Sequence, residues 1–217
     1  MKTLKWQQYL EEQLVQGKKL FTVAELANVA ATSHHALNVE LERLTKRRVL
    51  EKYARGIYGA PNKAAPADLV RYLDAHAYIT SAYALFCHGI ITQTPKTFTC
   101  FTDRRHNRSR VRKTSLGRFI FVTVKKPRYA PPADALIAPG EQALYDFVYL
   151  MRRQGINPRN VVTFRNLNNL RQHPDDCTLH YPASVKKNVA DLLETGPKTG
   201  QGQRGWPALA IKRIAKF

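Results

Sequence analysis

The sequence predicts an α+β protein with two domains, one over residues 1–60 and one over residues 67–217. Three observations support this division. Helix-type and strand-type patterns are mixed in both parts, and 217 residues are enough to bury a sizeable core. Between the parts, Pro61 and Pro66 disfavour helix in a short Ala-containing run. Residues 61–66 are therefore expected to be a linker.

The first domain is organised around a helix that is expected to begin after Ser33 and to end at Arg47. The hydroxyl of Ser33 can accept a hydrogen bond from a first-turn amide that has no partner inside the helix. Leu37, Leu41 and Leu44 recur at i, i+4 and i+7, so they share one stripe that faces a core. The opposite side is mostly polar and is expected to face a partner.

A shorter helix is expected just before this one. Thr22 and Glu25 have the spacing of a capping box, which starts a helix that ends near Ala30. Thr32 and Ser33 leave room only for a tight turn. Two helices joined in this way form a helix-turn-helix, whose second helix normally lies in the major groove of DNA. An ordinary helical bundle is the alternative.

A β-hairpin is expected after the second helix. Residues 49–53 and 57–58 are β-prone, and the turn between them contains Gly56, which can take a positive φ. Arg55 would lie at the hairpin tip, where its charge suits a phosphate or a narrow minor groove. The first domain is therefore predicted to be a winged helix-turn-helix, followed by a mixed α/β C-terminal domain.

The charge of the chain favours a polyanionic partner. Thirty-five Lys and Arg against 16 Asp and Glu give a net charge of +19 and a pI near 10.1. Residues 61–128 contribute +10 of this charge and residues 1–60 only +4. No apolar run approaches the roughly 20 residues of a membrane span, and no secretion signal is evident. Three scattered cysteines fit a reducing compartment, so a cytoplasmic protein is expected.

The remaining elements are read from periodicity and breakers. A helix over residues 4–16 is expected to brace the first domain. In the second domain we expect strands over residues 97–102 and 119–124, of which the second is apolar on both faces and is expected to be internal. We also expect helices over residues 68–75, 82–88, 141–154, 161–170 and 184–193. Residues 195–205 are expected to be loose, and residues 207–217 to form a short basic helix.

The densest charge lies between the two expected strands, where six basic residues occur within ten positions with no acid among them: Arg104, Arg105, Arg108, Arg110, Arg112 and Lys113. In an extended chain, the period of two over residues 108–112 would point three guanidinium groups the same way. Such an array could contact successive phosphates and form a second nucleic-acid surface. A solvated hairpin loop is the alternative.

Three motifs in order resemble the AbiEi family, the antitoxin and autoregulator component of abortive-infection type IV toxin–antitoxin systems. The first runs from Phe21-Thr22-Val23-Ala24-Glu25-Leu26 to Gly56-Ile57-Tyr58. The second is Tyr78-Ile79-Thr80-Ser81-Ala82-Tyr83-Ala84-Leu85 with His88-Gly89-Ile90 and Pro95. The third is Pro139-Gly140-Glu141-Gln142-Ala143-Leu144-Tyr145-Asp146, which departs from the family pattern by an inserted Gly and by Gln for Lys.

This resemblance implies a repressor that binds inverted repeats in its own promoter. It also implies a second domain that counters a nucleotidyltransferase-like toxin without forming a stable complex with it. On this interpretation the protein is not an enzyme and needs no cofactor. Residues 104–113, here called the arginine-rich loop, and residues 195–217, the C-terminal tail, lie outside the three motifs. The resemblance implies nothing about either segment.

The base-contacting residues follow from the geometry of the expected helix, because its N-terminal turns enter the groove first. Asn38 can pair with adenine through two hydrogen bonds, and Val39 can contact a thymine methyl group. Glu42 on this face would repel phosphates unless it accepts from a cytosine amine. The predicted DNA-binding residues are Ser33, His34, His35, Asn38, Val39, Arg43, Lys46, Lys52 and Arg55, of which the last three are expected to contact the backbone.

Two other function classes compete with this hypothesis. An RNA-binding protein would use the arginine-rich loop as its working surface. A metal-dependent nuclease would need clustered carboxylates, for which the sequence offers only Asp175, Asp176, Asp191 and Glu194. A zinc ion could use the spacing of His173, Cys177 and His180, but no fourth ligand or general base is evident. We therefore expect no catalytic and no metal-binding residues.

Overall fold

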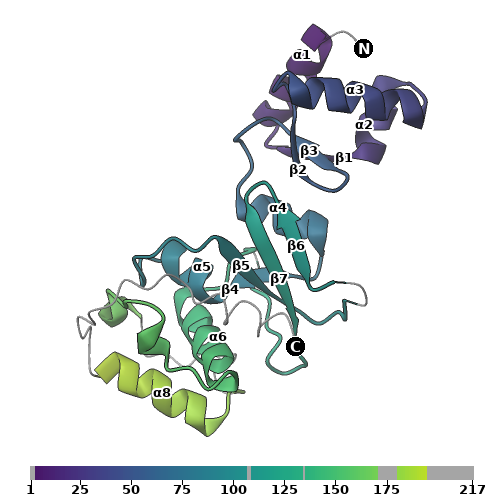
Figure 1. Cartoon of the computed structure of the whole chain (residues 1–217). Coiled ribbons are helices and arrows are strands. Elements are labelled where there is room, and N and C mark those ends of the chain that lie inside the picture. The colour runs from purple at the N-terminus through teal and green to yellow at the C-terminus, as the bar shows by residue number, and fades with distance from the viewer. Residues whose placement is uncertain (1–2, 107–108, 134, 171–179, 195–217) are drawn as a thin grey trace. The chain divides into compact units, whose positions relative to one another are not determined.

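A computed structural model gives the fold of the chain. It describes all residues except 1–2, 107–108, 134, 171–179 and 195–217 (Figure 1). The described residues form helices and two β-sheets, so the expected α+β class is confirmed. Contacts divide the chain into two compact units. Unit 1 comprises Met1–Leu73 and Lys113–Leu116, and unit 2 comprises Asp74–Arg112 and Gly117–Phe217.

Unit 1 contains four helices and a small antiparallel sheet. The helices are α1 (Thr3–Val15), α2 (Val23–Ala30), α3 (His34–Lys46) and α4 (Pro66–Leu73). The strands are β1 (Leu20–Thr22), β2 (Glu51–Ala54) and β3 (Ile57–Gly59), in the order β1-β3-β2. The helices expected over residues 4–16, after Thr22 and after Ser33 are thus confirmed, as is the hairpin, whereas β1 was not expected.

Strand β1 completes the sheet through a close backbone approach. Leu20 is paired with Gly59 on the neighbouring strand β3. A Cβ atom added at Gly59 would lie 2.3 Å from the carbonyl oxygen of Lys19, so only glycine fits this position without a shift. The glycine at the end of the hairpin therefore allows the segment before α2 to join the sheet.

The linker expected over residues 61–66 does not coincide with the division that the contacts give. Helix α4 begins at Pro66 and belongs to unit 1. Its Asp68 forms an ion pair with Lys19 at 3.0 Å, and the Tyr72 hydroxyl donates to the carbonyl oxygen of Leu20 at 2.8 Å. Pro61 lies in the turn after β3 and Pro66 is the first residue of α4, but neither proline determines which neighbour that helix packs against. The division therefore falls after Leu73.

Unit 2 is built on a four-stranded mixed sheet. Its strands are β4 (Tyr78–Thr80), β5 (Thr97–Thr102), β6 (Val111–Thr114) and β7 (Gly117–Thr123), in the order β4-β5-β7-β6. The last two residues of β6 belong to the segment that the contacts assign to unit 1. Strands β5 and β7 run parallel, and β4 is antiparallel to β5. The strands expected over residues 97–102 and 119–124 are confirmed as β5 and β7, and β7, which was expected to be internal, lies between β5 and β6. Strand β4 was not expected.

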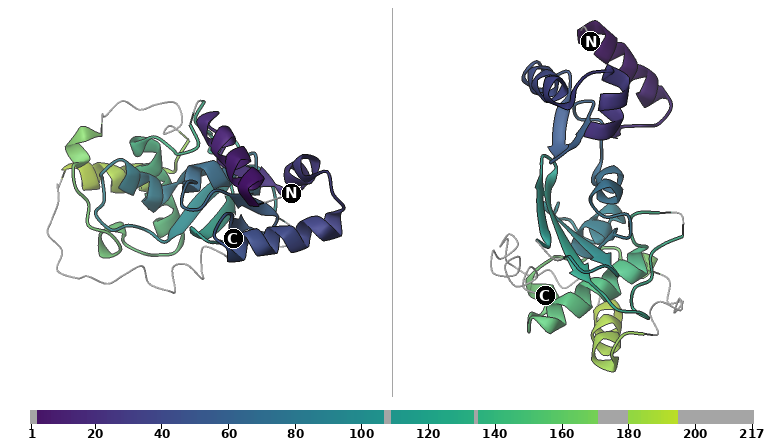
Figure 2. Two further views of the ribbon diagram at one scale, coloured as in Figure 1. Left: turned by 90° about the horizontal axis from the view of Figure 1, so that it is seen from above. Right: turned by 90° about the vertical axis from the view of Figure 1, so that its right-hand side faces the viewer.

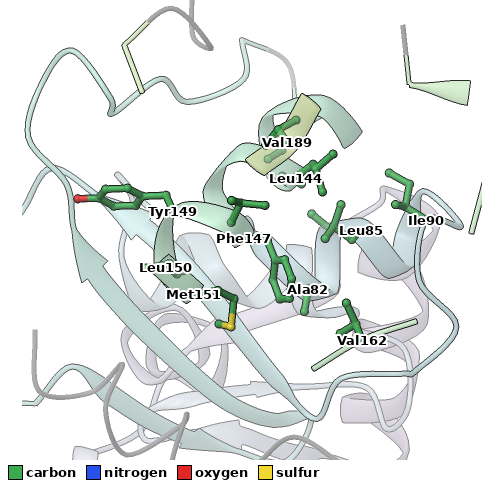
Figure 3. Packing of buried hydrophobic residues seen from close by; sticks show 14 of the residues in the cluster. Ala82, Leu85, Ile90, Leu144, Phe147, Tyr149, Leu150, Met151, Val162 and Val189 are labelled. Carbon is green, nitrogen blue, oxygen red and sulfur yellow. The ribbon is translucent and has the colours of Figure 1, made fainter. Parts of the chain in front are cut away.

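The helices of unit 2 pack around α6 (Gly140–Arg153), which contacts α5 (Ser81–Cys87), α8 (Ala183–Glu194) and strand β4 (Figures 1 and 2). Leu144, Phe147 and Val148 form the predicted apolar stripe of α6 and are fully buried. In Figure 3 the side chains of Leu144 and Phe147 point toward Leu85 of α5. The helices expected over residues 82–88, 141–154 and 184–193 are confirmed as α5, α6 and α8, with each end within one residue of the expected one. The helix expected over residues 68–75 is α4, which begins and ends two residues earlier.

The helix expected over residues 161–170 is wrong. This stretch contains only a short 3-10 turn at Leu167–Asn169, after another at Pro158–Asn160. Phe164 instead forms a β-bridge with Ile91, and the amide of Arg165 donates to the carbonyl oxygen of Ile90 at 2.7 Å. Asn166 takes a φ of 51°, which a helix interior does not allow. The expectations for residues 195–217 lie outside the described residues.

A fully buried carboxylic acid occupies the interior of unit 2. Asp146 of α6 is 0% exposed and accepts a hydrogen bond from the Thr80 hydroxyl at 2.5 Å and another from the Tyr181 hydroxyl. Burial raises the pKa of Asp146 to about 7, although the two hydroxyl donors lower it in part. The third motif of the sequence therefore ends on a residue that links α6, β4 and the segment before α8.

We predict that Asp146→Asn stabilises the protein increasingly as the pH rises. The folded pKa of about 7 lies above the unfolded value of about 3.9, so the native state keeps a proton that the unfolded chain has released. The Asp146 carboxyl therefore lowers the free energy of unfolding as pH rises from about 4 to about 7. Asparagine does not ionise, so the variant lacks this pH-dependent loss of stability. Urea unfolding between about pH 5 and pH 8 measures it. Parallel pH profiles for the two chains would contradict the prediction, and Glu194→Gln, an exposed carboxylate on α8, is the control.

Candidate nucleic-acid interface

Helix α3 presents a polar face whose start is capped as predicted. The Ser33 hydroxyl accepts a hydrogen bond from the amide of Ala36 at 3.4 Å, and the helix runs from His34 to Lys46. His35, Asn38 and Arg43 are exposed, and Val39 is 39% exposed although it is apolar. His34 lies in the first turn of the helix. Of the sequence-predicted contacts on α3, the following are thus brought together on its exposed side: His35, Asn38, Val39, Arg43 and Lys46.

The inner side of α3 is fixed by burial. Leu37 and Leu41 are 0% exposed and Leu44 is 3% exposed, in one cluster with Trp6 and Leu26. Burying such leucines stabilises by roughly 1.5–3 kcal/mol each, so turning the helix about its axis would be costly. This cost decides which residues face outward.

A second contact connects α3 to α1. The indole Nε1 of Trp6 donates to a carboxylate oxygen of Glu40 at 2.7 Å, and Arg47 donates to the hydroxyl of Thr3 at 3.2 Å. These bonds join the middle of α3, at Glu40, and its C-terminal end, at Arg47, to α1 across more than 30 residues of sequence. The outer side of α3 is therefore held in place by packing from behind.

The connection between α2 and α3 is tight, as expected. Thr22 and Glu25 form both halves of the predicted capping box, with the Thr22 amide donating to Glu25 at 2.7 Å. Burial raises the pKa of Glu25, but hydrogen bonds from Lys18 and Thr22 outweigh it and hold the pKa below its usual range. Ala31 ends α2 in the left-handed region with a φ of 48°. The chain then reverses within three residues before α3 begins.

The β2–β3 hairpin holds Arg55 exposed at its tip. Strand β2 ends at Ala54 and β3 begins at Ile57, so the turn is Arg55-Gly56, and Gly56 has a φ of 76°. The carbonyl oxygen of Gly56 accepts a hydrogen bond from the amide of Val23 at 3.1 Å. Because Val23 is the first residue of α2, this bond positions the hairpin turn against the start of that helix. Lys52 is also exposed, with its ammonium group 5.8 Å from the centre of the Tyr58 ring.

One acidic residue lies on the outer side of α3. Glu42 forms an ion pair with Lys46 at 2.9 Å, and both side chains are mostly exposed. The hydrogen bond and the charge of Lys46 hold the pKa of Glu42 below its usual value. Such an exposed i,i+4 pair contributes little stability, so it exchanges readily for another partner. Lys46, expected to contact phosphate, is thus engaged by a neighbour in this structure.

The basic side chains of the arginine-rich loop differ in their exposure, so they do not form one evenly exposed row. Arg104, Arg105 and Lys113 are exposed, and Arg110 and Arg112 are half-buried. The carbonyl oxygen of Arg110 accepts from the amide of Phe121 at 2.8 Å, so strand-like pairing begins there and Arg110 and Arg112 share one side. The guanidinium of Arg112 donates to the carbonyl oxygen of Ser109. Arg108 lies outside the described residues.

Two histidine–carboxylate contacts at the start of this loop were not expected from the sequence. His106 Nε2 lies 3.0 Å from a carboxylate oxygen of Asp74, and His76 Nδ1 lies 3.0 Å from Asp103. Burial raises the pKa of Asp74, but hydrogen bonds from the His76 amide, Thr102 and His106 together leave it lowered. These contacts join two segments of unit 2 that are about thirty residues apart, and so they position the residues that precede the basic run.

The residues considered for catalysis or zinc do not form a site in the described part of the chain. Asp191 and Glu194 are exposed on α8, and His180 is exposed in the turn before it. The other candidates, Asp175, Asp176, His173 and Cys177, lie outside the described residues. Among residues that the structure describes, no three His, Cys, Asp or Glu side chains gather where they could hold a metal ion. None of the described helices has the length and apolarity to cross a membrane.

The fold and its surfaces define a basic α+β protein with an exposed, N-capped helix beside an Arg-tipped hairpin. Comparison with protein-family models and with curated proteins found no match to this chain. Function is therefore inferred from the geometry of α3 and the hairpin and from the motifs of the sequence.

We predict that Glu42→Gln tightens binding to duplex DNA. The change removes a negative charge from the outer side of α3 and releases Lys46 from its ion pair, so one more phosphate can be neutralised. The slope of log affinity against log salt should steepen by about one. Fluorescence anisotropy over a salt series measures this, with Glu194→Gln as a control for net charge. Weaker binding by Glu42→Gln would instead mean that Glu42 accepts a hydrogen bond from a base.

Proposed function

We propose that this chain is a winged helix-turn-helix DNA-binding repressor that reads duplex DNA with the outer side of α3. The observation that carries the proposal is the division of α3 into a buried leucine side and an exposed side with His35, Asn38 and Val39. In this proposal α2 and α3 are the helix-turn-helix and the β2–β3 hairpin is the wing. The capped N-terminus of α3 supports this role, because its first turns would enter the major groove.

The proposed contacts divide into two kinds. His34, His35, Asn38 and Val39 would contact base edges, because they lie in the first two turns of α3. The positively charged residues would contact the phosphate backbone and set the register of the protein on the duplex. These are Arg43 and Lys46 on α3, and Lys52 and Arg55 on the hairpin. Ser33 would act through its cap on α3.

The repressor would act on its own promoter, as the antitoxin of a type IV toxin–antitoxin system. The order of the three sequence motifs supports this assignment by its resemblance to the AbiEi family, and the net charge of +19 supports a nucleic-acid partner. In this proposal unit 2 opposes a nucleotidyltransferase-like toxin in the cytoplasm without a stable complex and without catalysis. The two copies of the protein would occupy the two halves of an inverted repeat.

A second candidate function is RNA binding by the arginine-rich loop. One observation favours it: residues 104–113 carry six basic and no acidic side chains, and unit 1 is less basic than the segment that contains them. A preference for single-stranded or structured RNA over the operator duplex in a competition assay would establish this reading. A preference for the operator duplex would establish the repressor.

A footprint on DNA upstream of the gene for this chain tests the proposed function. We expect protection of an inverted repeat, with an affinity that falls steeply as salt rises because several phosphates are neutralised. An unrelated duplex of equal length is the competitor. Equal competition by that duplex, with no protected sequence, would refute sequence-specific repression.

Two substitutions should distinguish residues that recognise bases from residues that bind the phosphate backbone. Asn38→Ala should lose about 1–3 kcal/mol of discrimination at one base pair, because the paired hydrogen bonds to adenine are absent. Arg55→Ala should weaken all duplexes alike, because a phosphate contact carries no sequence information. Anisotropy with the operator and a set of single-base variants measures both. If Arg55→Ala leaves operator affinity unchanged, the assignment of the hairpin as a wing is wrong.

A further inference from the structure

The outer face of α1 carries two exposed apolar side chains at its ends. Leu4 is 65% exposed and Val15 is 89% exposed, the two largest values among the exposed large apolar residues of the described chain. Gln8 and Glu11 lie between them, so the four residues follow the spacing i, i+4, i+7 and i+11. This is the spacing of the positions, here called the seam, that meet when a helix pairs with another helix; here the two outer positions are apolar and the two inner ones, Gln8 and Glu11, are polar.

This seam lies on the side of α1 that faces away from its own unit. Trp6 and Leu10 are buried on the inner side, where Trp6 also bonds to Glu40 of α3. At 100° per residue, the seam centred on Gln8 and Glu11 is on the opposite side of the helix. A partner on the seam would therefore leave the outer side of α3 uncovered, since α3 contacts α1 from the inner side.

The seam is complementary to itself when a second copy lies antiparallel. Leu4 of one copy then faces Val15 of the other, and Gln8 faces Glu11, which it can hydrogen-bond. In a parallel pair each Glu11 would face the other Glu11, which like charges disfavour. The sequence of α1 thus selects one relative direction for two identical helices.

The residues that flank the seam select the same direction. Lys5 and Glu12 are exposed and lie one position after Leu4 and Glu11. In an antiparallel helix pair these flanking positions face each other, so Lys5 of one copy faces Glu12 of the other, and the two-fold axis repeats the pair. Two opposite-charge pairs therefore border the two apolar contacts.

We propose that a second copy of this chain docks on α1 in antiparallel fashion through the seam Leu4, Gln8, Glu11 and Val15. The contact is small, so free chains associate weakly, whereas two copies on one DNA meet at an effective concentration of about a millimolar. The proposal deepens the proposed function by naming the contact between the two repressor copies. Its first test uses no DNA, so the two proposals can fail separately.

Cysteine crosslinking tests the register of the contact. Leu4→Cys and Val15→Cys are made separately in a background with Cys87→Ser and Cys177→Ser, so that the buried Cys100 is the one native cysteine left. We expect a crosslinked dimer when the two variants are mixed and oxidised, and several-fold less in either variant alone. In an antiparallel pair the two cysteines at position 4 are about 16 Å apart, beyond the reach of a disulfide. Equal crosslinking in the single and mixed samples, or none in the mixture, overturns the proposal.

A charge exchange tests the flanking pairs by a readout that does not need cysteines. Lys5→Glu alone and Glu12→Lys alone each place like charges opposite each other in their own dimer, so each should lose cooperative binding to the two-half-site operator. Mixing the two variants restores opposite charges at both pairs and should restore cooperativity. Lys63→Glu, an exposed change of equal charge outside α1, is the control.

The outcomes distinguish the contact from the function. Single-half-site affinity should stay within about twofold of the control for every variant, because the seam is remote from the outer side of α3. If the mixture of charge variants binds no better than each variant alone, the docking proposal is wrong while repression stands. If the mixed cysteine variants crosslink but no variant and no parent chain protects DNA, the contact stands and the repressor function is wrong.

Discussion

The burial of Leu37, Leu41 and Leu44 is the constraint on which the account of unit 1 depends. These side chains fill the space between α3 and the helices behind it, together with Trp6 and Leu26. Because the three leucines repeat at helical spacing, burying them fixes the rotation of α3 about its axis and hence the identity of the exposed residues. The chemistry offered to a partner is thus determined from the inner side of the helix.

Two features then fix the position of a positive charge in the same unit as α3. Gly56 allows the tight turn between β2 and β3, and its carbonyl bond to Val23 holds that turn against the start of α2. Arg55 is thereby presented from a hairpin that is tied to the helix pair. The combination of a polar helix face and a neighbouring cation is what a duplex with grooves and phosphates requires.

The parts of the fold that local chemistry determines could be predicted from the sequence. Ser33, Thr22 and Glu25 mark helix starts by side-chain bonds within a few residues, and the leucine period marks a buried side. Strands β1 and β4 are only three residues long, so no local pattern distinguishes them, and their pairing partners are distant in sequence. The apolar residues after Val161 suggested a helix, but the backbone bonds there go to the segment around Ile90 instead.

In the candidate sites, too, local features could be predicted from the sequence and contacts between distant residues could not. Exposure of His35, Asn38 and Arg55 follows from periodicity and a turn, and was predictable. The side chains that hydrogen-bond the carboxyl groups of Asp146 and Asp74 lie 28 or more residues away, which no spacing rule reveals. No local pattern therefore indicates that Asp146, the last residue of the third motif, is a buried acid in the core.

The most direct test of the central claim is an amide NMR titration of the full chain with its operator duplex. The account predicts that the largest shift changes map to residues 33–46 of α3 and to the hairpin turn at Arg55, while α8 changes little. Changes confined to unit 2, with α3 unaffected at saturating duplex, would contradict it.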